Sequence, residues 1–97
     1  MLPRAEEIRQ ALQAALSPVR LEVIDESAAH SGHAGAQVDG VEHGFGTHFR
    51  VRIASHSFTG LSRVAQHRLV YDATQSFVER GLHALAIEIQ PVQTDAP

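Results

Sequence analysis

Histidine is the residue type with the greatest chemical potential in this 97-residue chain, which contains seven histidines and no cysteine. Imidazole binds metal ions and titrates near neutral pH. Without cysteine, the chain itself supplies no disulfide, no thiolate nucleophile and no cysteine-ligated metal site. His30 and His33 stand three residues apart in a glycine-rich stretch without periodicity, and such a pair alone is weak evidence for zinc. The histidines are therefore candidate ligands whose arrangement depends on the fold.

A basic cluster follows a turn in the segment FTGLSRVAQHRLVY, residues 58–71. Gly60 is expected to break the chain after a strand, and the Ser62 hydroxyl is expected to cap a helix by accepting a hydrogen bond from the Ala65 N–H. Three basic side chains then fall to one side of the apolar residues: Arg63, His67 and Arg68. Either these side chains are simply solvated, or they form a patch that contacts phosphate.

Composition and motifs weigh against several classes of function. The net charge of −3 argues against strong non-specific binding to nucleic acid. No apolar run approaches the roughly 20 residues needed to span a bilayer, and the N-terminus lacks the apolar region of a signal peptide, so a cytoplasmic protein is expected. No spacing assembles a nucleophile, a base and an orienting group, and no phosphate or dinucleotide motif is present. We therefore do not expect an enzyme.

Hydrophobic periodicity predicts two helices and three strands in a single domain, residues 1–97. They are a helix over 4–16, strands over 19–26 and 47–55, a helix over 62–79 and a strand over 84–89. The second helix carries two apolar stripes, and it either curves or breaks near Asp72. Leu61, Ala65 and Leu69 form one stripe, and Val70, Ala73 and Phe77 form the other. Residues 27–46 are expected to form a long flexible loop and residues 91–97 a frayed tail.

The order α-β-β-α(α)-β predicts an α+β domain of two layers. In the strand over 47–55, apolar residues alternate with His48, Arg50 and Arg52, so one sheet face should be covered by helices and the other should be wet. The first two strands should be antiparallel. The second and third, joined through a helix by a right-handed crossover, should be parallel. The expected sheet is therefore three-stranded and mixed, with the helices on one face.

The order and spacing of five motifs between Leu21 and Ile89 resemble the BolA family. These motifs are LEVIDES, HF-x-V, F-x-G-x-S, HR-x-V-Y and HALAI, with a glycine-rich, histidine-bearing loop after the first. The resemblance implies a fold similar to a class II KH domain, in agreement with the predicted element order. The chain departs from the family at Gln66, where an arginine is usual, and so lacks one cation on the helix.

The resemblance also implies a non-enzymatic partner of a monothiol glutaredoxin in iron–sulfur cluster handling. In such a complex the glutaredoxin supplies a cysteine and glutathione a thiolate to a [2Fe–2S] cluster, while the BolA side supplies histidine nitrogen. The isolated chain is not expected to bind a cluster. His83, in HALAI, matches the family ligand, and His30 matches the second ligand, with His33 in reserve. From its parity with Leu85 and Ile87, His83 could instead be a half-buried residue bonded to a backbone carbonyl.

Some family members are described as transcriptional regulators, which implies DNA binding as the alternative function. KH domains clamp a nucleic-acid backbone through a GXXG loop. The corresponding turn at residues 59–62 has one glycine, so the contacts would come from the turn and helix at 60–68. The candidate DNA-binding residues are Gly60, Ser62, Arg63, His67 and Arg68. The sequence gives no sign of a membrane partner and leaves the oligomeric state open, a homodimer included.

Overall fold

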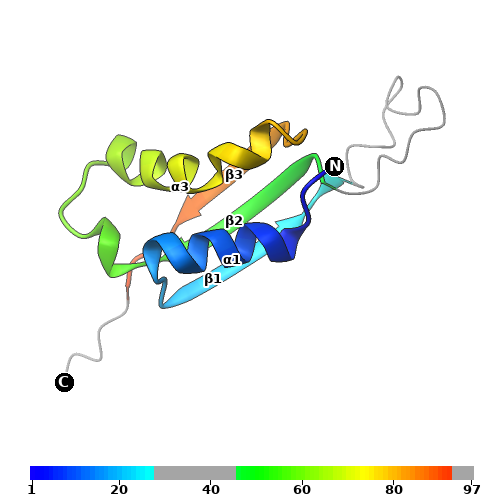
Figure 1. Cartoon of the computed structure of the whole chain (residues 1–97). Helices are drawn as coiled ribbons and strands as arrows, with labels where there is room; N and C mark the ends of the chain where they lie inside the picture. The colour runs from blue at the N-terminus through cyan, green and yellow to red at the C-terminus, as the bar shows by residue number, and fades with distance from the viewer. Residues whose placement is uncertain (28–45, 93–97) are drawn as a thin grey trace.

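A computed structural model describes residues 1–27 and 46–92 of the chain. Within these ranges, helices α1 (Ala5–Leu16) and α3 (Arg63–Val78) cover one face of a sheet (Figure 1). The sheet contains β1 (Arg20–Asp25), β2 (His48–Ala54) and β3 (Ala84–Ile89), and a short 3-10 turn, η2 (His56–Phe58), follows β2. No helix in the described ranges is long and apolar enough to cross a membrane. The predicted α+β class is confirmed, and the element bounds differ from the predicted ones by no more than one residue.

The central strand of the sheet is β2. The strand order is β1-β2-β3, with β1 antiparallel and β3 parallel to β2. Val51 of β2 lies opposite Val23 of β1 and opposite Ile87 of β3. The parallel β2–β3 pair confirms the predicted crossover through α3, and it brings the first residues of β2 and β3 to the same end of the sheet.

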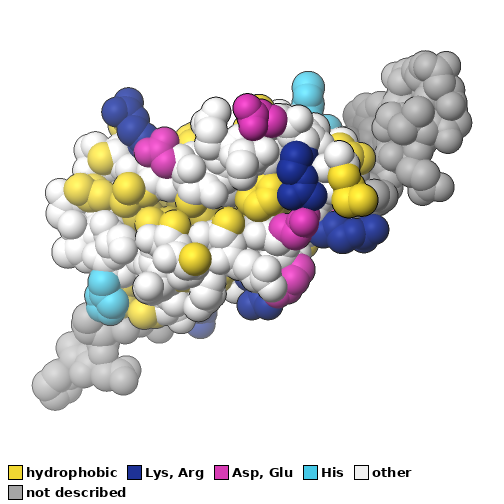
Figure 2. Space-filling view, viewed as in Figure 1, with side chains coloured by type: hydrophobic (Ala, Val, Ile, Leu, Met, Phe, Trp, Pro, Cys, Tyr) yellow, Lys and Arg dark blue, Asp and Glu magenta, His cyan; other side chains and the backbone are white. Residues whose placement is uncertain are grey.

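The core forms between the apolar face of β2 and the two helices. Phe49, Val51 and Ile53 of β2 are almost fully buried, and they belong to one cluster with Ile8 and Leu12 of α1. Figure 2 shows apolar side chains between the two helices, with charged side chains around them. The alternation of β2 therefore predicts the core face correctly.

The helix α3 is continuous from Arg63 to Val78, so of the two alternatives for this helix the break near Asp72 is absent. Of its two apolar stripes, the one containing Val70 and Phe77 enters the core. In the other stripe, Leu69 is partly buried against the core, whereas Leu61, which precedes the helix, is 38% exposed. Only one side of a straight helix can face the sheet, which explains why the first stripe stays near the surface.

The open face of the sheet carries a ladder of ion pairs. Arg50 contacts Glu26 at 2.8 Å and Glu88 at 2.6 Å, while Arg52 contacts Glu88 at 3.0 Å and Glu22 at 3.3 Å. The hydrogen bonds from both arginines lower the pKa of Glu88. The outward row of β2 is therefore wet, as predicted, but its two arginines are paired with carboxylates from both neighbouring strands.

Candidate functional site

The end of α3 fixes the position of His83. Gly81 has a φ of 108°, and the N–H groups of Gly81 and Leu82 donate to the carbonyls of Val78 at 3.1 Å and Phe77 at 3.0 Å. This is the Schellman pattern, and it ends the helix at Gly81. Leu82 is 7% exposed within the core, whereas His83 is exposed. The expectation of a half-buried His83 is therefore wrong, because Leu82 fills the core at this point instead.

His48, the first residue of β2, lies beside His83. The parallel register places His48 opposite Ala84, and the Thr47 carbonyl accepts hydrogen bonds from the N–H groups of His83 at 2.8 Å and Ala84 at 3.0 Å. The centroids of the His48 and His83 rings are 5.4 Å apart, with the planes tilted by 54°. The His48 Nδ1 is hydrogen-bonded to the Thr47 hydroxyl at 3.0 Å. Two imidazoles thus meet at the start of two adjacent parallel strands.

A polar brace beside this pair involves Asp25 and Ser27, both of the LEVIDES motif. The Ser27 hydroxyl oxygen, on a residue 1% exposed, accepts from the N–H groups of Thr47 at 2.9 Å and His48 at 3.0 Å. The Asp25 carboxylate accepts from the N–H groups of Ser27 at 2.9 Å and Gly46 at 3.0 Å. Sequence reasoning missed this role, although an Asp two residues before a Ser after a strand is a signal for a side-chain-capped turn.

The predicted loop ligands His30 and His33 lie outside the described residues, as does most of the loop predicted at 27–46. Within residues 1–27 and 46–92, no three side chains of His, Cys, Asp or Glu converge as a metal site would require. The His48–His83 pair can therefore supply two ligands to a metal centre, with further ligands coming from elsewhere. His48 was missed by sequence reasoning because its parity assigned it to the outward row with the arginines.

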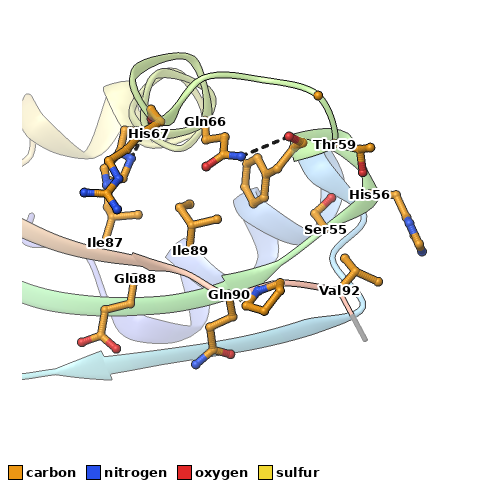
Figure 3. A pocket seen from close by; sticks show the side chains of 14 residues that line it. Ser55, His56, Thr59, Gln66, His67, Ile87, Glu88, Ile89, Gln90 and Val92 are labelled. Carbon is orange, nitrogen blue, oxygen red and sulfur yellow. Dashed lines mark hydrogen bonds between the residues drawn. The ribbon is translucent and has the colours of Figure 1, made fainter. Parts of the chain in front are cut away.

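The candidate DNA-binding residues surround a cleft at the opposite end of β3. The cleft has a volume of about 840 Å³ and lies between η2, the start of α3 and the end of β3 (Figure 3). Gly60, Arg63 and His67 line it together. Arg68 lines a neighbouring hollow of about 540 Å³, which shares Arg63 and His67 with the cleft. The His67 Nδ1 donates to the Arg63 carbonyl at 2.9 Å, which holds the ring against the helix.

Ser62 and Gln66 brace the turn that borders this cleft. The Ser62 hydroxyl accepts from the Ala65 N–H at 3.1 Å, which confirms the predicted cap. The Gln66 side-chain amide donates to the carbonyls of Phe58 and Leu61, each at 3.2 Å. Gln66, where the family usually has arginine, therefore contributes hydrogen bonds to the turn in place of a surface cation.

Comparisons with known proteins agree with this architecture. The family model described as BolA-like protein matches residues 12–93. The chain is 46% identical over 84 residues to SufE-like protein 1, chloroplastic/mitochondrial, of Arabidopsis thaliana, an alignment that covers 87% of this chain and 22% of that protein. It is 34% identical over 88 residues to the DNA-binding transcriptional regulator BolA of Escherichia coli strain K12, covering 91% and 75% of the two chains. The solved structure of BolA1 from Arabidopsis thaliana matches with a TM-score of 0.76 and 41% identity, over 94% of each chain.

Proposed function

The chain belongs to the BolA-like protein family, and from this premise we propose that it is a non-enzymatic partner of a monothiol glutaredoxin that co-ligates a [2Fe–2S] cluster through His83. The proposal includes a role in the assembly, trafficking or sensing of such clusters. The observation that supports it most directly is the 5.4 Å separation of the His48 and His83 ring centroids. A cytoplasmic location stays a prediction. The name of one relative contains two organelles, but they describe that relative and not this chain.

The geometry of the pair fits two ligands of one metal ion. Imidazole nitrogens bind such ions at about 2 Å, which places the centroids of two rings on one ion roughly 5 Å apart. A chain without cysteine can contribute only ligands of this kind. Thiolates from the glutaredoxin and from glutathione would complete the coordination. When imidazole replaces thiolate on one iron, the cluster potential rises and the ligation becomes sensitive to pH.

Backbone hydrogen bonds hold both histidines in place. The backbone of His83 is anchored by its bond to the Thr47 carbonyl and by the buried neighbour Leu82. His48 stands at a strand end that is braced by Ser27. Because His83 matches the family ligand, we assign it as the principal ligand and His48 as the second ligand, with His30 and His33 as the alternatives from the loop.

Anaerobic reconstitution of the chain with a monothiol glutaredoxin and glutathione tests this function. We expect a visible circular dichroism spectrum that differs from that of the glutaredoxin alone, and we expect His83→Ala to abolish the difference. His48→Ala should change the spectrum if His48 is the second ligand, whereas a change in His30→Ala and not in His48→Ala would assign the loop. His56→Ala, an exposed histidine at the far end of β2, is the control. A spectrum that the added chain leaves unchanged would contradict the proposal.

DNA binding is the second candidate function, and one arrangement favours it. Arg63 and His67 line the cleft together with the Gly60 turn, and the Escherichia coli relative is named as a DNA-binding regulator. On this alternative, α3 and the turn before it contact phosphate, and the Arg63→Ala/Arg68→Ala double variant should lose the binding of duplex DNA near physiological salt.

A further inference from the structure

The outer edge of β3 presents unpaired backbone groups. β3 pairs only with β2 in the described sheet. The N–H groups of Ala84 and Gln90 donate to β2-side carbonyls, those of Thr47 at 3.0 Å and Ile53 at 2.8 Å. Backbone N–H and C=O groups alternate in direction from one residue to the next along a strand. Those of every second residue between Ala84 and Gln90 therefore also face β2. The N–H and C=O groups that point away from β2 therefore belong to the other parity: Leu85, Ile87 and Ile89.

The two edges of the sheet differ in their protection. The edge strand β1 contains Arg20, Glu22 and Asp25, and charged side chains discourage pairing with another strand. The edge strand β3, with the sequence ALAIEI, contains one charged residue, Glu88. The Glu88 carboxylate is already bonded to arginines of β2 on the open face. The β3 edge therefore carries less charge than the β1 edge.

The cleft runs along this edge. Its lining includes the continuous segment from Ile87 to Val92, which in an extended chain spans roughly 20 Å. Ile87 and Ile89 point toward α3 and its Gln66, whereas Glu88 and Gln90 point to the other side of the strand (Figure 3). A ligand in the cleft would thus have an apolar floor beside a row of backbone donors and acceptors.

The side of α3 above this edge is also uncovered. Val64 is 69% exposed and Tyr71 is 49% exposed, and both line the hollow that shares Arg63 and His67 with the cleft. Apolar side chains of an added strand would pack against Val64 and Tyr71. Arg63 and His67 would favour a carboxylate at the same place.

We propose that the outer edge of β3 binds an extended, acidic–apolar segment of another protein as a fourth strand. Alternate apolar side chains of the segment lie between β3 and α3, and one acidic side chain meets Arg63 and His67. Strand addition is an established mode of peptide recognition in which main-chain hydrogen bonds give affinity and side-chain pockets give specificity. A nucleic-acid backbone fits this edge less well, because phosphate groups only accept hydrogen bonds and leave the outward carbonyls of β3 without donors.

Selection from a phage-displayed library of random 12-residue peptides on the full chain tests the proposal. We expect enriched sequences in which apolar residues alternate with polar ones and an acidic residue is fixed. On binding, amide exchange of Leu85, Ile87 and Ile89 should slow by at least about tenfold, as expected for newly bonded N–H groups. N-methylation of the edge-facing residues of a selected peptide should weaken binding by at least about tenfold, because each methyl group removes a main-chain donor.

Variants of the chain separate this site from the two functions above. Ile87→Pro removes one outward N–H without removing a bond to β2, and it should weaken binding, whereas Ile87→Val should not. His83→Ala should leave peptide binding unchanged, so failure of the cluster proposal and failure of this one are distinguishable. Arg20→Ala, on the opposite edge strand β1, should also have no effect.

Three results would overturn the proposal. One is a library that yields no enriched sequence. Another is a selected peptide whose N-methylated form binds equally well. The third is that single-stranded oligothymidine slows amide exchange in β3 while no peptide does. This result would assign the cleft to nucleic acid.

Discussion

At the scale of single residues, a comparison of Gly46 and Gly60 distinguishes the effect of backbone strain from that of steric contact. Both have left-handed φ values, 85° and 79°. A Cβ on Gly46 would lie 2.7 Å from the Leu2 Cβ and 2.9 Å from the Pro3 carbonyl oxygen, whereas a Cβ on Gly60 would meet nothing within 4 Å. We expect Gly60→Ala to lower the free energy of unfolding by about 1 kcal/mol through strain, and Gly46→Ala by about 3 kcal/mol through strain and overpacking. Urea denaturation measures both, and equal losses would contradict the role of contact.

Local signals at single residues were predictable, and one distant pairing was not. The Ser62 cap depends on a neighbour within a few residues, and its prediction is confirmed. The His48–His83 pair depends on the parallel register between β2 and β3, which places His48 opposite Ala84. No local pattern contains that register. Sequence reasoning therefore identified His83 as a candidate ligand but did not identify His48 as its neighbour.

At the scale of elements, the Glu88 bridge across β2 and β3 predicts an acid-dependent stability. Hydrogen bonds from Arg50 and Arg52 lower the pKa of Glu88 below its usual value of 4.5. A carboxyl whose pKa is depressed by folding stabilises the fold above its unfolded pKa, and this contribution is lost as the pH falls through its folded pKa. We expect the free energy of unfolding to decline below about pH 4.5, and we expect Glu88→Gln to make that decline shallower. Thermal unfolding across this pH range measures the effect.

The control for this prediction is Glu79→Gln, which removes an exposed carboxylate outside the ladder. It should leave the acid decline as steep as in the unchanged chain. Glu6 and Glu7 also have lowered pKa values through bonds to Arg9 and Arg80, so some decline persists in Glu88→Gln. Identical declines in Glu88→Gln and in the unchanged chain would contradict a stabilising bridge.

The bounds of α3 were predictable, whereas its buried face was not. Its cap and its glycine stop define the ends, but two apolar stripes competed for the core. Packing against the sheet selects the stripe with Val70 and leaves Val64 and Tyr71 at the surface. Val64 and Tyr71 belong to neither stripe, and their exposure beside the cleft at β3 is visible only in the folded structure.

Over the whole molecule, the distribution of charge limits how the chain can bind DNA. The net charge is −3 and all eight cationic side chains are arginines. Four of them, Arg9, Arg50, Arg52 and Arg80, form ion pairs with carboxylates in the described structure. The candidate surface on α3 offers Arg63 and Arg68, with His67 between them. Two to three phosphate contacts would give log affinity a slope of about −2 to −3 against log salt concentration.

Titration of duplex DNA at several salt concentrations measures this slope. Arg63→Ala/Arg68→Ala should abolish the binding, whereas Arg20→Ala, an arginine on the far edge strand, should not change it. A slope steeper than about −5 would require cations beyond α3. His83→Ala should leave DNA binding intact, because His83 precedes β3 while the cleft lies along its end. Loss of DNA binding in that variant would contradict the division of the molecule into a histidine end and a cleft end.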